Sequence, residues 1–238
     1  MNSRFRLLTC ALALFSAAVA SAQTVINVAF GSTPYTGLSA VPGSTSSDVW
    51  NLWSAPNGAV DGSWLSGALV DATGAATLVE GEARSTTDQL WNGGIPGNAI
   101  TLFDSYWHLS GLGTLTVTIS GLAEYSVHDL YIYGARRTDD PDILVGPGSS
   151  AFTVGSTTLT TSYDGSVSSF DESINYVRFV SLVADSKGMI IFTADESISN
   201  GFSLVSPTTP VPEPATYAAL AGLAALGLAI QYRRRKTA

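Results

Sequence analysis

Two tryptophans and two short polar side chains are grouped closely enough to form a carbohydrate-binding site. Trp50 and Trp53 lie within SSDVWNLWS (46–54), with Asp48 and Asn51 close to them. If this segment makes a short helical turn, residues three apart share one face. Indole rings can stack on sugar rings, and carboxylate and amide groups can bind sugar hydroxyls. The segment therefore predicts a ligand-binding pair, although the large apolar area of an indole makes burial in the core the alternative for each tryptophan.

A second concentration of polar groups is RRTDDPD, which spans residues 136–142. It contains Arg136, Arg137, Asp139, Asp140 and Asp142. Loops at the rim of a β-sandwich commonly carry binding groups, so the arginines are further ligand-binding candidates. The three aspartates are hard oxygen ligands that could bind Ca²⁺. Their spacing does not match an EF-hand loop and the arginines could neutralise them, so a solvated turn is the alternative.

Motifs for catalysis are absent from the sequence. The two histidines, His108 and His128, stand far apart, and no H-E-x-x-H zinc pattern is present. There is no G-x-S-x-G nucleophile elbow and no phosphate-binding loop. A glycosidase needs two carboxylates about 5–9.5 Å apart, but no motif selects such a pair here. A secreted polysaccharide-degrading enzyme therefore remains only an alternative.

The net charge of the middle part of the sequence excludes one class of partner. Between Gln23 and Ser206, 18 acidic residues stand against five basic ones, a net charge of −13. Nucleic acid is not an expected partner, because its binding depends on Lys and Arg that neutralise phosphates. Cys10 is the only cysteine, so the chain after residue 22 has no disulfide or thiol chemistry.

The elements that would position these groups are short strands between residues 23 and 206. We predict strands at 24–30, 75–80, 114–120, 128–134, 150–155, 157–161, 175–183, 188–193 and 201–205. TLTVTIS (114–120) alternates aliphatic residues and threonines, which indicates a sheet with one face in the core. HDLYIYG (128–134) is apolar on both faces, as in a central strand covered on both sides. The pattern predicts an all-β fold, an antiparallel β-sandwich, with long loops between residues 30 and 75.

The N-terminus is typical of an exported protein. Residues 1–22 contain Arg4 and Arg6, then an apolar run, then small residues that include Ala20 and Ala22. This order predicts a secretory signal peptide that is cut after Ala22. An N-terminal membrane anchor is the alternative, but the apolar run is shorter than the ~20 residues needed to span a bilayer.

The C-terminus combines three parts. They are a proline-rich linker (207–214), an apolar segment predicted to be one transmembrane helix (215–232) and a basic cytoplasmic tail (233–238). The linker ends in Val211, Pro212, Glu213 and Pro214, and the tail begins with Arg233, Arg234, Arg235 and Lys236. Basic residues that follow an apolar helix stay in the cytoplasm, which leaves the acidic domain on the other side of the membrane.

This C-terminal combination resembles the PEP-CTERM sorting signal of Gram-negative bacteria. The resemblance implies that the tail halts translocation and is processed near the Pro-Glu-Pro motif by exosortase, a membrane enzyme. It also implies transient anchoring in the inner membrane, followed by a cell-surface or extracellular-matrix destination, because such bacteria tend to make exopolysaccharide.

A second resemblance to a known family lies in the middle part of the sequence. INVAFG near the start of the domain is followed by TVTISGL (116–122), DLYIYGA (129–135), YVRF (176–179) and NGFSLV (200–205). These strand motifs are similar to those of galactose-binding-like jelly rolls, which are carbohydrate-binding-type sandwiches.

Together these features predict an exported surface or biofilm-matrix protein with a non-catalytic role. Extracellular polysaccharide and an exosortase-type enzyme are the expected partners, and the C-terminal helix is the expected membrane contact. No cofactor is expected except the Ca²⁺ that the three aspartates at 139, 140 and 142 could bind. A polysaccharide-degrading enzyme and a ligand-free structural protein are the alternatives.

Overall fold

The computed structural model describes residues 23–54, 63–65, 67–85, 90–94, 97–109, 113–135, 150–162, 167–195 and 198–206. These residues belong to one compact unit, which runs from Gln23 to Pro207. Several predictions lie outside the described residues: the signal peptide with Ala20 and Ala22, Arg136 and Arg137, Asp139, Asp140 and Asp142, the motif at 211–214, the helix at 215–232 and the basic cluster at 233–236. Within the described ranges, no helix is both long and apolar enough to cross a membrane.

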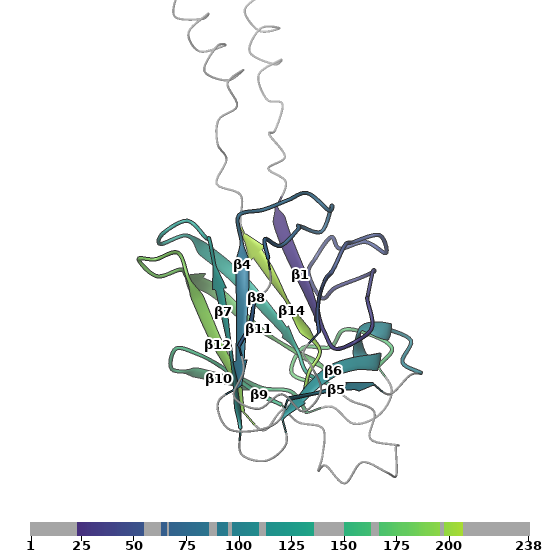
Figure 1. The fold of residues 1–238 in the computed structure, drawn as a ribbon. Coiled ribbons are helices and arrows are strands. Elements are labelled where there is room, and N and C mark those ends of the chain that lie inside the picture. Colours follow the sequence, from purple (N-terminus) through teal and green to yellow (C-terminus); the bar gives the residue numbers. More distant parts are fainter. Residues whose placement is uncertain are drawn as a thin grey trace, which may run out of the picture. The chain divides into compact units, whose positions relative to one another are not determined.

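Two sheets form the body of the unit (Figure 1). The first has the order β11 (Tyr176–Val183), β8 (Val127–Tyr133), β14 (Gly201–Ser206), β1 (Thr24–Phe30) and β2 (Asn51–Trp53). The second has the order β10 (Thr157–Thr160), β9 (Ala151–Val154), β12 (Ile190–Asp195), β7 (Thr114–Ser120), β4 (Glu80–Ser85) and β3 (Ser63–Leu65). Their strands pair antiparallel except for β1 with β2. The described part of the chain is therefore all-β, as predicted, with antiparallel sheets in a β-sandwich.

A smaller third sheet lies beside the sandwich. It contains β13 (Ile198–Ser199), β6 (Ser105–Leu109) and β5 (Leu90–Gly94), and a single 3-10 turn, η1 (Thr101–Asp104), precedes β6. Asn200 ties this region to the first sheet, because its side-chain amide donates to the carbonyl of Ser105 and its Oδ1 accepts from the N–H of Ala135.

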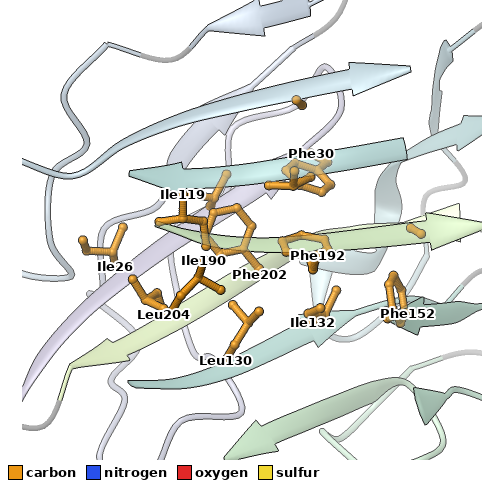
Figure 2. Close-up of a cluster of buried hydrophobic side chains, with 14 of the residues drawn as sticks. Ile26, Phe30, Ile119, Leu130, Ile132, Phe152, Ile190, Phe192, Phe202 and Leu204 are labelled. Atoms are coloured by element: carbon orange, nitrogen blue, oxygen red, sulfur yellow. The ribbon is translucent and has the colours of Figure 1, made fainter. Parts of the chain in front are cut away.

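The main core lies between the two large sheets (Figure 2). Leu130 and Phe202 from the first sheet meet Val117 and Phe192 from the second, and all four are fully buried. On β7, buried and half-buried residues alternate along the strand. The period-two pattern predicted for residues 114–120 is therefore confirmed.

A second apolar cluster covers the outer face of the first sheet. Tyr131 and Tyr133 of β8 pack there with Trp50, Leu102 and Phe103, which come from loops and from η1. The alternate residues of β8, among them Leu130, belong to the main core. As predicted from residues 128–134, β8 is a central strand buried on both faces.

One predicted strand is wrong. Residues 75–79 lie in a loop that makes only an isolated bridge, Val70 with Ala76, and β4 begins at Glu80. The sequence of β4, EGEARS, contains few β-formers. Pairing with β7 on one side and β3 on the other holds it in the sheet, with Ala83 buried in the main core.

Candidate functional site

Trp50 and Trp53 do not form the predicted stacking pair. Trp53 ends the edge strand β2 and Trp50 directly precedes this strand, so the predicted helical turn is wrong. Residues three apart point to opposite faces of a strand. Trp50 belongs to the outer cluster and Trp53 to the main core, and each side chain is only 7% exposed.

Each tryptophan has a structural partner in its own cluster. The indole N–H of Trp50 donates to the carbonyl of Gly37 over 3.0 Å. Trp53 stacks on Phe30 at 5.6 Å between ring centroids, and Trp107 stacks on the same ring at 4.2 Å. Trp50, Trp53 and Trp107 are thus buried, while the side chains of Trp64 and Trp91 lie outside the described residues.

An open cleft of about 530 Å³ lies beside the start of β1. Two loops line it, 42–48 and 71–73, together with Gln23 and Val25. Most of its lining side chains are polar: the hydroxyls of Ser44, Thr45, Ser47 and Thr73, the carboxylates of Asp48 and Asp71, and the amide of Gln23. Of the predicted ligand-binding residues that the structure describes, Asp48 lines this cleft.

Asn51 fixes one wall of the cleft without lining it. Its Nδ2 donates to the carbonyls of Asn27 and Val70, each over 2.8 Å, and its Oδ1 accepts from the N–H of Val70 over 2.9 Å. These bonds hold the segment before residue 71 against β1. Asn51 therefore positions a wall of the cleft. The sequence predicts a different role for it, a direct contact with the sugar.

Asp71 is the lining residue that sequence reasoning missed. Its Oδ1 accepts from the N–H and hydroxyl of Thr73, over 2.9 and 2.6 Å, and from the N–H of Ala75 over 3.0 Å. Gly74 completes this tight turn at φ +86°, a conformation that favours glycine. Burial pushes the pKa of Asp71 upward, but these hydrogen bonds outweigh it and lower the pKa below its usual value. The turn sequence DATG is the local signal that could have pointed to this residue.

Asp48 faces the cleft from the other loop. Its Oδ1 accepts from the hydroxyl of Thr45 over 2.6 Å. Burial, with a smaller contribution from the charge of Asp48, raises the pKa of Tyr35 to about 12. Tyr35 is therefore a neutral donor at physiological pH, and its hydroxyl donates to the carbonyl of Leu38 over 2.9 Å. Together, the cleft presents hydroxyl donors and carboxylate acceptors, the groups that bind polyols.

A second polar group lies on β8 and β11. Arg178 forms an ion pair of 2.6 Å with Asp129, and its guanidinium lies 5.2 Å from the ring centroid of Tyr131. Asp129 also accepts from the N–H of Ser181, where β11 is irregular. Burial pushes the pKa of Asp129 upward, but the hydrogen bond from Arg178, the N–H of Ser181 and the charge of Arg178 lower it overall. This pair therefore stabilises β11 where its pairing with β8 is irregular.

Acid should remove the contribution of Asp129 to stability. Because its pKa in the folded state is lowered, that contribution is complete above the ordinary aspartate pKa of about 3.9 and disappears as the pH falls through the lower folded value. At neutral pH, Arg178→Met should reduce the free energy of unfolding by roughly 1 kcal/mol or less, as expected for a partly exposed pair. Urea unfolding of both forms across the acid range measures this difference.

The control for this prediction is Lys187→Met, since Lys187 makes no ion pair with any described residue. Its effect should not vary through the same pH window. A difference between the native protein and Arg178→Met that persists unchanged at acidic pH would contradict the role given to Asp129.

Metal-binding side chains do not gather within the described part of the chain. No group of three or more His, Cys, Asp or Glu residues is placed there to hold a metal ion. Asp139, Asp140 and Asp142, the predicted Ca²⁺ ligands, lie outside that part.

Similarity to a known family lies near the C-terminus. The PEP-CTERM protein-sorting motif matches residues 210–235. The chain carries a PEP-CTERM sorting motif. No curated protein and no solved structure matches the chain.

The PEP-CTERM match confirms the prediction made from Pro-Glu-Pro, the apolar run and the arginines. It implies export, membrane-anchored processing and an exosortase as the processing enzyme, in a Gram-negative bacterium. The described fold ends at Ser206, just before this motif, where the hydroxyl of Ser206 lies 3.0 Å from Nδ1 of His128. The motif concerns export and processing, while groups that could bind a ligand line the cleft.

Proposed function

We propose that this is a non-catalytic polysaccharide-binding protein of the cell surface or extracellular matrix, delivered there by its PEP-CTERM tail. The observation that carries the proposal is the polar cleft beside β1. Its volume of about 530 Å³ falls within the usual range for small-ligand sites, about 300–1,000 Å³. Its hydroxyls and carboxylates offer both donors and acceptors for sugar hydroxyls.

The fold places this cleft on a rigid support. Its loops are tied to β1, since the N–H of Ala72 donates to the carbonyl of Val25 and Asn51 holds Val70. We propose the galactose-binding-like jelly roll as the type of sandwich. Support comes from the pairing of β1 with β14, which places the first and last described strands side by side.

A non-catalytic role is supported by the electrostatics of the cleft. A glycosidase needs a general acid whose pKa is raised, so that it keeps its proton near neutral pH. Hydrogen bonds lower the pKa of Asp71 instead. This carboxylate is suited to accepting hydrogen bonds from a ligand, not to protonating a leaving group.

A ligand-free structural role is the second candidate. The burial of Trp50, Trp53 and Trp107 favours it, because none of these side chains offers an exposed stacking surface. The two candidates differ in whether the cleft has an occupant.

A glycan array tests the proposal. The chain, exported from a Gram-negative host that lacks exosortase so that the tail is kept, and purified in detergent, should bind at least one polysaccharide. Ser47 is exposed and lines the cleft, so Ser47→Trp should fill the cleft and weaken binding by about tenfold or more. Thr158→Trp, on an exposed position of β10 away from the cleft, is the matched control and should bind as the native chain does.

Two results would overturn the proposal. One is the absence of binding to any glycan, which would favour the structural role. The other is equal binding by the native chain and Ser47→Trp, which would place the glycan elsewhere.

A further inference from the structure

The charged side chains that line the cleft are all acidic. If the proposed function holds, this charge affects which glycans the cleft binds. Asp48 and Asp71 both line it, one from each loop. Among the residues that line it, none is a lysine, an arginine or a histidine. A bound ligand would therefore meet two carboxylates without a compensating cation from the lining.

Each carboxylate keeps one oxygen available. The hydrogen bonds from Thr73 and Ala75 to the carboxylate of Asp71 end on Oδ1, and Thr45 likewise donates to Oδ1 of Asp48. None of these four bonds ends on Oδ2 of either side chain. An ionised carboxylate can accept about four hydrogen bonds, so each Oδ2 has capacity for a ligand donor.

The turn also keeps Asp71 charged. Its hydrogen bonds lower the pKa of this carboxyl, so the negative charge persists under mildly acidic conditions. Hydrogen bonds between an ammonium and a carboxylate are shorter and about twice as strong as those between neutral groups. A ligand with amino groups would gain this advantage, whereas a uronate would be repelled.

We infer that the cleft selects amino-sugar polymers, in which at least part of the sugars carry a free amine, over the same polymers in N-acetylated form and over acidic polymers. The free Oδ2 atoms of Asp48 and Asp71 accept from the ammonium groups, and the hydroxyls of the lining bind the ring hydroxyls. N-acetylation removes the charge and adds an acetyl group, so it weakens both contacts.

The net charge of the domain would also attract cations, so a matched control must separate the two effects. Asp185 provides it, because it builds the same turn outside the cleft. Its Oδ1 accepts from the N–H of Lys187 over 2.8 Å and of Met189 over 2.9 Å, and Gly188 follows at φ +68°. Asp185→Asn thus changes the same charge in the same kind of turn without touching the cleft lining.

Calorimetry with two oligosaccharides tests the inference. Glucosamine hexamer and N-acetylglucosamine hexamer have the same backbone, and at about pH 6 amines are protonated while aspartates are normally ionised. The full-length chain should bind the glucosamine hexamer about tenfold tighter or more. Asp48→Asn and Asp71→Asn should each reduce this preference severalfold, since asparagine keeps the acceptor Oδ1 for the turn but loses the charge. Asp185→Asn should leave the preference unchanged.

The outcomes separate this inference from the proposed function. Equal or tighter binding of the N-acetylated hexamer overturns the inference and leaves glycan binding intact. A preference that Asp185→Asn weakens as much as Asp71→Asn does would assign it to general surface charge, which also overturns the inference. If the chain binds neither hexamer, the inference is also overturned. The glycan array then decides the proposed function separately.

Discussion

Replacing Phe202 with alanine should lower the free energy of unfolding by about 3–5 kcal/mol. Phe202 is fully buried on β14, and its ring lies 5.7 Å from that of Phe192 on the opposite sheet (Figure 2). It also contacts Phe30 and Trp53, at 6.0 and 5.6 Å between ring centroids. Removing the ring leaves a cavity between the two sheets that the surrounding rings cannot fill without moving. The total stability of a domain is about 5–15 kcal/mol, so a large share would be lost.

Urea unfolding followed by tryptophan fluorescence measures this effect, because Trp53 lies against the deleted ring. Leu78→Ala is the control, since Leu78 is 87% exposed and its truncation should change stability by less than about 0.5 kcal/mol. A loss below about 1 kcal/mol for Phe202→Ala would show that the two sheets do not share the core described here.

Neutralising the basic cluster of the PEP-CTERM tail should release the chain from the membrane. Replacing Arg233, Arg234, Arg235 and Lys236 with serine removes the charges that we expect to hold the C-terminus in the cytoplasm. Placing an arginine at the centre of a membrane helix costs about 2.5–3.5 kcal/mol, so the native cluster opposes passage strongly. The apolar run of residues 215–230 is short for a bilayer core of about 30 Å, and alone it should retain the chain poorly. Fractionation should show a severalfold loss from the membrane and uncut chain in the periplasm.

Changing the three arginines of the cluster to lysine is the matched control, because the charge is kept. This variant should fractionate like the native chain. Identical membrane fractions for the serine variant and the native chain would contradict the stop-transfer role of the cluster.

The strands that could be predicted are those whose own side chains specify their environment. β1 and β7 begin and end where their β-formers do, and β8 is shifted by only one residue from its prediction. β4 could not be predicted, because its residues gain their strand conformation from pairing with β7 and not from their own propensity. The same cause explains β2, where pairing with β1 makes residues 51–53 an edge strand in place of the predicted helical turn.

The candidate site depends even more on distant contacts. The sequence points to Asp48 through a helical turn at 46–54 that the structure lacks, yet Asp48 lines the cleft. Asp71 was missed because no local pattern places it opposite Asp48. That arrangement arises from contacts between segments far apart in the sequence: the bond from Ala72 to Val25, and the bond from Val49 to Ala72. In contrast, the sorting motif at 210–235 is a contiguous run of residues, which is why it could be predicted from the sequence alone.

The termini and location of the native protein test the central claim most directly. Mass spectrometry of the protein recovered outside the cytoplasm of an exosortase-positive host measures both. The account predicts a chain that begins at Gln23, contains the whole sandwich through Ser206 and ends near the Pro-Glu-Pro motif, with the apolar run and the arginines removed. A chain recovered in the cytosol with Met1 and Ala238 both present would contradict it.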